Sequence, residues 1–165
     1  FRSRFKTTGI SGGIQMELHH FKISLGASYI GRYNEFSNQV AQSVYNWTTE
    51  GQFNLSYEFK SIGLTTALFI KYQGALPSYT IGADDQVEEL FVDAYTWSDF
   101  TIAKSLWKNQ INLSTGIKNL FNVESVNSSV SSSSSGGVHT GGGSLPVGMG
   151  RSFFISLKYN FISKS

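Results

Sequence analysis

The sequence contains no cysteine and only two prolines, and charged residues make up 15% of the chain. Without cysteine the chain forms no disulfide and carries out no thiol chemistry. A charged fraction of 15% is low, since soluble globular domains contain about 25% charged residues. The net charge of +2 is too small to indicate a nucleic-acid partner. The chain also lacks any apolar run of the ~20 residues that a membrane-spanning helix needs.

Aromatic residues are plentiful, at 15% of the chain, and apolar and polar residues alternate over long stretches. In the last such stretch the apolar side chains occupy every second position: Phe153, Ile155, Leu157, Tyr159 and Phe161. Four polar side chains fall on the other set of alternate positions: Ser152, Ser156, Lys158 and Asn160. A strand directs alternate side chains to opposite faces, so this pattern predicts a strand with one wholly apolar face. A soluble protein buries such a face, whereas an outer-membrane barrel turns it toward lipid.

Seven segments alternate in this way and predict antiparallel strands at 9–18, 21–33, 44–59, 62–73, 90–104, 110–121 and 150–161. Each has at least the ~9–11 residues that a tilted membrane-crossing strand needs. Segment 90–104 is the least regular, because Tyr95 and Trp97 fall on its polar face. The connections alternate between short and long, and the long ones cover 34–43, 74–89 and 122–149. Short periplasmic turns opposite long extracellular loops are typical of bacterial barrels.

The aromatic residues are predicted to gather at both ends of the strands, with Tyr29 and Trp47 toward the long loops and Tyr57 and Phe59 toward the short turns. Two such girdles are typical of a barrel in a bilayer. The predicted fold class is therefore all-β, a transmembrane antiparallel up-and-down barrel. Bacterial single-chain barrels have even strand numbers, and an open sheet edge in lipid costs several kcal/mol per unpaired group. We therefore expect residues 1–161 to be a portion of a larger barrel and 162–165 to be a short tail.

Two motifs resemble the C-terminal end of TonB-dependent outer-membrane receptors. Thr115-Gly-Ile-Lys-Asn-Leu-Phe-Asn122 is similar to their penultimate strand, and Gly150-Arg-Ser-Phe-Phe-Ile-Ser-Leu-Lys-Tyr-Asn-Phe161 is similar to their last strand. Tyr95-Thr before Asp99 also resembles them, and Val138-His-Thr-Gly-Gly-Gly143 resembles versions from Bacteroidetes. Such barrels usually end at the final aromatic residue, whereas here residues 162–165 continue.

The resemblance implies the bacterial outer membrane, a barrel of about 22 strands and an N-terminal plug inside it. It implies active import of a scarce nutrient, either an iron chelate, haem, cobalamin or a glycan. The partners implied are membrane lipid, the upstream strands and plug of the same receptor, the TonB–ExbB–ExbD complex acting through an N-terminal part upstream of Phe1, and a surface lipoprotein. No apolar signal-peptide core opens the chain, so an exported protein is expected to begin upstream.

Two other classes of function stay open. A passive porin or structural barrel fragment shares every hairpin feature, and an upstream series of strands without a plug would indicate it. A soluble β-sandwich binding module would dissolve without detergent and fold alone. In such a module, however, the apolar faces formed by alternate residues of the strands would leave a large exposed patch.

The candidate substrate contacts are aromatic or imidazole side chains: Tyr79, Phe91, Tyr95, Trp97 and His139. Aromatic side chains grip ligands by stacking, and packing within loops is the alternative role for them. His139, in a long loop, is a candidate contact for haem or a metal chelate, although a lone histidine rarely makes a metal site.

The candidate contacts to the plug are charged residues on the inner face: Glu50, Glu58, Asp99 and Lys118. The alternative role for these residues is only to face water on the inner wall of the barrel. His19 and His20 are predicted to lie in a periplasmic turn with structural or solvated roles, so no metal site is predicted. No Ser/His/Asp set or carboxylate pair has a spacing that would bring it together. We therefore predict no catalytic residue, no cofactor and no enzymatic activity.

Overall fold

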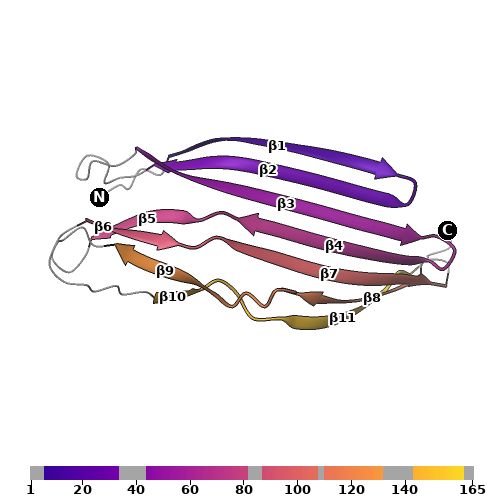
Figure 1. Ribbon diagram of the computed structural model, residues 1–165. Coiled ribbons are helices and arrows are strands. Elements are labelled where there is room, and N and C mark those ends of the chain that lie inside the picture. The colour runs from indigo at the N-terminus through magenta and orange to yellow at the C-terminus, as the bar shows by residue number, and fades with distance from the viewer. Residues whose placement is uncertain (1–5, 34–43, 82–86, 108–109, 132–142, 162–165) are drawn as a thin grey trace.

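The computed structural model describes residues 6–33, 44–81, 87–107, 110–131 and 143–161, and their regular structure is entirely β-strand (Figure 1). The strands are β1 (Thr7–Leu18), β2 (Phe21–Tyr33), β3 (Tyr45–Phe59), β4 (Leu64–Gln73), β5 (Leu76–Ile81), β6 (Val87–Val92), β7 (Tyr95–Leu106), β8 (Ile111–Lys118), β9 (Ser125–Ser131), β10 (Gly143–Pro146) and β11 (Ser152–Tyr159). No helix long and apolar enough to cross a membrane occurs in these ranges.

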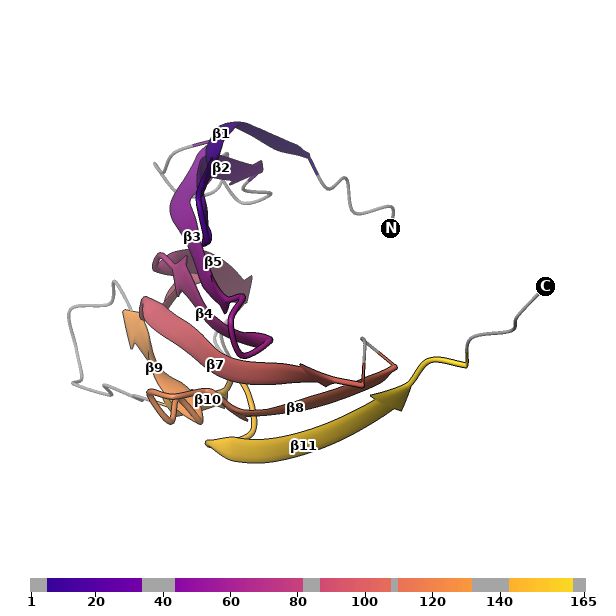
Figure 2. The same cartoon turned by 90° about the vertical axis from the view of Figure 1, so that its right-hand side faces the viewer.

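Seven long strands form one antiparallel sheet in the order β1-β2-β3-β4-β7-β8-β11. The all-β prediction and the antiparallel pairing are confirmed, and six of the seven predicted strands match within a few residues. The sheet bends into an open arc, with β1 and β11 at its two ends (Figure 2). Among the described residues these two edge strands do not pair with each other, so this sheet is not a closed barrel.

The strand register aligns the apolar positions of neighbouring strands into rows on one face. One such row runs across the whole sheet: Met16, Ile23, Leu55, Leu68, Phe100, Ile117 and Phe153. No described segment covers this outward face, and Phe153 is 74% exposed and Ile155 is 76% exposed. Val126, in β9, is the buried hydrophobic residue of the described part of the chain. Within the described residues, the large sheet therefore has no core packed on its apolar face.

Aromatic rings cluster at both ends of the outward face. Tyr29 and Trp47 stack with ring centroids 4.7 Å apart at the end near the small sheet. Gly31 makes room for this pair, because a Cβ there would lie 3.0 Å from the Trp47 ring. At the short-turn end the ring centroid of Tyr57 lies 4.5 Å from the ring centroids of both Phe21 and Phe59. The predicted sorting of aromatics to the two strand ends is confirmed.

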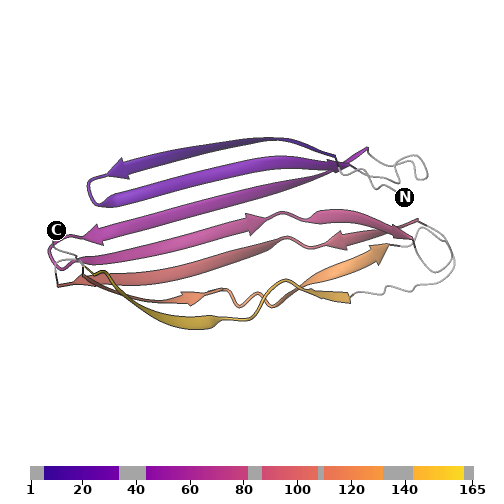
Figure 3. The ribbon, with the colours of Figure 1, turned by 180° about the vertical axis from the view of Figure 1, so that it is seen from behind.

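The predicted long loops 74–89 and 122–149 are wrong as loops, because they contain a second, four-stranded sheet in the order β10-β9-β6-β5. This small sheet continues beyond one end of the large sheet (Figures 1 and 3). Pro77 lies in β5 and Pro146 in β10, the two edge strands, where a missing N–H breaks no inner ladder. The two sheets are joined where the Asn46 amide donates to the Pro77 carbonyl at 3.2 Å.

The predicted strand 90–104 is also wrong at its start. The chain leaves the small sheet at Val92 and enters the large sheet at Tyr95. Asp93 at this break donates its N–H to the Asn127 carbonyl at 3.0 Å. Because the strand of the large sheet begins only at Tyr95, Leu90 and Val92 do not continue the outward row of β7.

Candidate functional site

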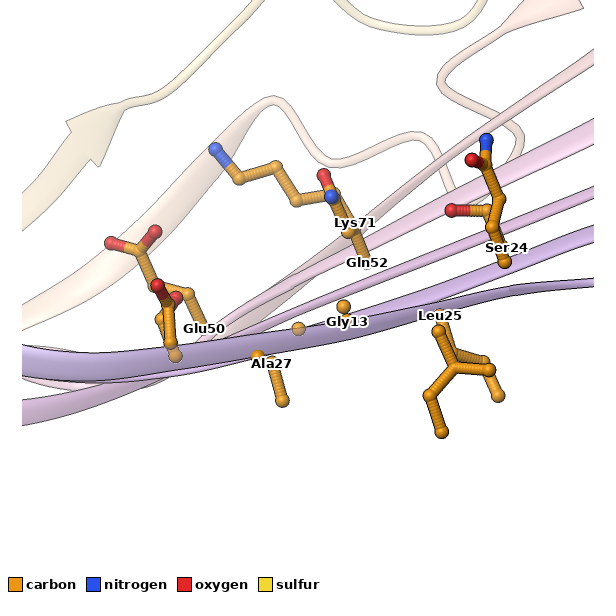
Figure 4. A pocket seen from close by; sticks show the side chains of 14 residues that line it. Gly13, Ser24, Leu25, Ala27, Glu50, Gln52 and Lys71 are labelled. Atoms are coloured by element: carbon orange, nitrogen blue, oxygen red, sulfur yellow. The ribbon is translucent and has the colours of Figure 1, made fainter.

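The polar side chains of the large sheet gather on the inward face, opposite the apolar rows. In Figure 4, Ser24, Glu50, Gln52 and Lys71 point to one side of the strands, while Leu25 and Ala27 point to the other. The register aligns Gln52, Lys71 and Trp97 across three strands. It also aligns Glu50, Gln73 and Tyr95 one step nearer the small sheet.

An open hollow of about 640 Å³ lies on this inward face over β1 to β4. The hollow is deepened where Gly13 and Gly26, which pair across β1 and β2, place no side chain into it. The Gln52 side chain lies over Gly26, where a Cβ would come 2.9 Å from its amide nitrogen. The residues that line the hollow include one carboxylate, Glu50, and one ammonium, Lys71, among hydroxyl and amide groups. The hollow is therefore a polar surface without an excess of either charge.

A second hollow of about 450 Å³ lies further along the same face, lined by Asn54, Phe69 and Asp99 among others. The ion pairs on this face are partly exposed: Arg32 to Glu50 at 3.6 Å and Lys22 to Glu17 at 3.2 Å. Exposed pairs of this kind contribute at most about 1 kcal/mol each. A face of this chemistry suits contact with water or with a polar partner.

Asn119 anchors the turn that follows β8. It is 1% exposed and has a left-handed backbone, with φ of 56°. Its amide nitrogen donates to the carbonyls of Val123 and Met149 at 2.9 and 3.0 Å, and its amide oxygen accepts the Val123 N–H at 2.9 Å. The side chain thus ties the segment after β8 to the segment that leads into β11.

Asp99 connects this turn to β7. One of its carboxylate oxygens accepts both the Trp97 indole N–H at 2.9 Å and the Asn119 backbone N–H at 2.8 Å. The Trp97 ring is covered by Gly148, where a Cβ would come 2.8 Å from the ring. Packing is therefore the role that the structure shows for Trp97, and substrate contact stays a prediction for it.

Asn122 and Arg151 close the same junction. Asn122 has φ of 55°, and its amide oxygen accepts the Arg151 backbone N–H at 2.7 Å. The Arg151 guanidinium donates to the Leu120 carbonyl at 2.6 Å. We call Asp99, Asn119, Asn122 and Arg151 the β8–β11 clasp. Sequence reasoning used these motif residues for the resemblance but assigned none of these bonds, since register and side-chain contacts cannot be read from alternation.

The structure brings together some of the predicted site residues and separates others. Tyr95 and Trp97 share the inward face with Glu50 and Asp99. Phe91 lies apart from them, exposed in β6 of the small sheet. The backbone of Tyr79 is in β5, but its side chain, like the whole of His139, lies outside the described residues.

The other charged candidates lie elsewhere on the inward face. Glu58 is exposed at the short-turn end of β3, and the Lys118 ammonium lies 5.6 Å from the centre of the Phe154 ring. Contact of these residues with a plug stays a prediction. His19 forms the β1–β2 turn with φ of 55°, and the His20 ring meets the edge of Tyr57 at 6.1 Å. No group of three potential metal ligands occurs in the described ranges.

Sequence reasoning did not single out Gln52, Lys71 or Gln73 on the inward face. Gln73 is buried, and its amide nitrogen has no hydrogen-bond partner among the described residues. Alternation assigned these residues to the polar face, but only the pairing of β3, β4 and β7 shows which of them adjoin Tyr95 and Trp97.

In comparisons with known proteins, no family model matches the chain, and no curated protein or solved structure matches it. The features of the chain that bear on its function are therefore the two faces of the large sheet and the motifs at its last two strands.

Proposed function

We propose that this chain is the C-terminal part of the barrel wall of a TonB-dependent receptor, which imports a scarce nutrient across the bacterial outer membrane. The observation that carries the proposal is the uncovered apolar face of the large sheet, bordered by aromatic rings at both ends. Soluble proteins rarely expose a contiguous apolar patch of more than a few hundred Å². Lipid is the surrounding in which such a face is stable.

The height of the face agrees with a bilayer. Trp47 and Phe59 mark the two aromatic ends of β3 and are twelve residues apart. At about 3.3 Å per residue and a tilt of about 45°, that separation corresponds to roughly 28 Å along the membrane normal. The apolar band of outer-membrane barrels is about 25 Å tall.

The open edges of the sheet support a larger barrel. β1 and β11 each present a row of backbone groups that no described strand pairs. Because unpaired groups in lipid cost several kcal/mol each, further strands of the same receptor are expected to pair with both edges and close the barrel. The polar inward face would then line the lumen, where Glu50 and Asp99 are candidates for contacts with the plug and Tyr95 for contact with the nutrient.

The two motifs that resemble TonB-dependent receptors favour the receptor over a passive porin. Residues of these motifs also bond to each other, since Arg151 donates to the Asn122 amide oxygen and to the Leu120 carbonyl. A porin remains the second candidate, since a hydrated polar lumen serves both. A soluble sandwich has less support, because no second layer covers the apolar face within the described residues.

Uptake in intact cells tests the proposed function. Cells that carry the gene and cells that lack it would be supplied with labelled ferric chelate, haem, cobalamin and oligosaccharide, each with and without an uncoupler of the proton-motive force. The receptor predicts gene-dependent uptake of one of these nutrients that the uncoupler abolishes. Gene-dependent uptake that persists with the uncoupler would favour the porin, and no gene-dependent uptake at all would contradict both.

Labelling of introduced cysteines tests the orientation, because these 165 residues contain no cysteine. Ser144 lies in β10 of the small sheet and Ser61 lies in the turn between β3 and β4 at the opposite end. A membrane-impermeant maleimide added to intact cells should label Ser144→Cys and leave Ser61→Cys unlabelled until the outer membrane is permeabilised. The reverse pattern would overturn the proposed orientation, and equal labelling of both would contradict membrane insertion.

A further inference from the structure

Lys104 is a charged residue on the otherwise uncharged outward face of the large sheet, as far as the structure describes it. The register places it in a row with apolar side chains from four other strands: Phe59, Leu64, Leu113 and Leu157. Among the outward positions of the seven strands that the structure describes, no other residue is charged. Its side chain is exposed and makes no ion pair with any described residue.

The row of Lys104 lies at the level of the aromatic residues near the short turns. Two residues at this end are of types that suit the boundary between acyl chains and headgroups. The first is Trp107, directly after β7, which is 73% exposed, and indole rings favour this boundary. The second is Lys60, a further cation, which begins the β3–β4 turn; a bond from the Ser105 N–H to the Gly63 carbonyl at 3.0 Å holds this turn against β7.

We propose that Lys104 binds the phosphate of an anionic phospholipid in the leaflet at the short-turn end, with the acyl chains lying along Leu64 and Leu113. This inference rests on the membrane insertion in the proposed function. An ammonium on a lipid-facing surface is costly in the acyl region, and a lysine stem is long enough to carry it to the headgroups. There an anionic phosphate supplies the counter-charge that no described residue provides.

Native mass spectrometry of the whole membrane-extracted protein in mild detergent tests the site, with phosphatidylglycerol as the probe and zwitterionic phosphatidylcholine as the comparison. Lys104→Met keeps the length of the side chain and suits a lipid-facing surface, so it should fold normally. It should lower the affinity for phosphatidylglycerol about fivefold, as expected for one lysine near an anionic headgroup, whereas Lys104→Arg should retain the affinity. Binding of phosphatidylcholine should be weak and equal in all variants.

Lys158→Met is the matched control. Lys158 pairs with Asn112 on the inward face, one residue from the row of Lys104, so the variant removes the same charge at nearly the same height. It should leave lipid binding unchanged. Equal binding by wild type and Lys104→Met, or an equal loss in Lys158→Met, would overturn the lipid site.

The outcomes of this experiment distinguish failure of the lipid site at Lys104 from failure of the proposed receptor function. A protein that stays in carbonate-washed membranes and imports nutrient but binds lipid independently of Lys104 would refute the lipid site alone. Binding that depends on Lys104 in a protein without energised uptake would refute the receptor alone. A protein that washes out of the membranes would refute both.

Discussion

Replacing Asn119 by alanine should lower the free energy of unfolding by about 3–5 kcal/mol. The variant loses three side-chain hydrogen bonds and leaves the polar backbone groups of Val123 and Met149 without these partners. It also places a Cβ without a polar group in the left-handed region, which alone costs about 1–2 kcal/mol. Urea unfolding of the whole protein in detergent micelles measures the total. Hydrogen exchange at the Val123 amide should accelerate with it.

Two further variants separate the causes. Asn119→Gly removes the same amide but tolerates a positive φ, so it should recover about 1 kcal/mol of the loss. Asn122→Ala has nearly the same backbone angle, 55°, but its amide bonds are exposed, and it should cost only about 1–2 kcal/mol. If Asn119→Ala were no less stable than Asn122→Ala, the buried amide would not anchor the junction.

The outward and inward faces of the large sheet could be predicted because alternation depends on the pleat alone. Leu55 and Asn54 differ by one position and so must face opposite sides of any strand that contains them. The same logic placed Tyr95 and Trp97 on the polar face of their strand. The strand ends near 18 and 59 were predicted by short connections, and the end near 33 was predicted by the long connection 34–43.

The small sheet could not be predicted in the same way. β5, β6, β9 and β10 have between four and seven residues each, and their serine-rich or irregular sequences give no clear period of two. The pairing of β6 with β9, which holds the small sheet together, is non-local, as in the partners Glu89 and Ser131. The clasp was hidden for a related reason, since the bond from Asn119 to Met149 spans thirty residues and depends on the register of β8 with β11.

Replacing Leu25 by arginine should destabilise the inserted protein by about 2–4 kcal/mol, because Leu25 lies near the middle of the apolar face. Its register partner Phe53 is midway between Trp47 and Phe59 on β3. An arginine here would put its charge where the bilayer is most apolar. The Leu25 side chain is 51% exposed, so a chain surrounded by water would tolerate the same change within about 0.5 kcal/mol.

Ser24→Arg is the control, since Ser24 is the preceding residue and points into the polar hollow (Figure 4). Both variants add one arginine at nearly the same height, so their difference isolates the face on which the charge stands. Reversible unfolding of the whole protein in phospholipid bilayers should show a loss of about 2–4 kcal/mol for Leu25→Arg and less than about 1 kcal/mol for Ser24→Arg. Equal losses, or a near-neutral Leu25→Arg, would mean that the outward face does not contact lipid, and the proposed transporter wall would have to be abandoned.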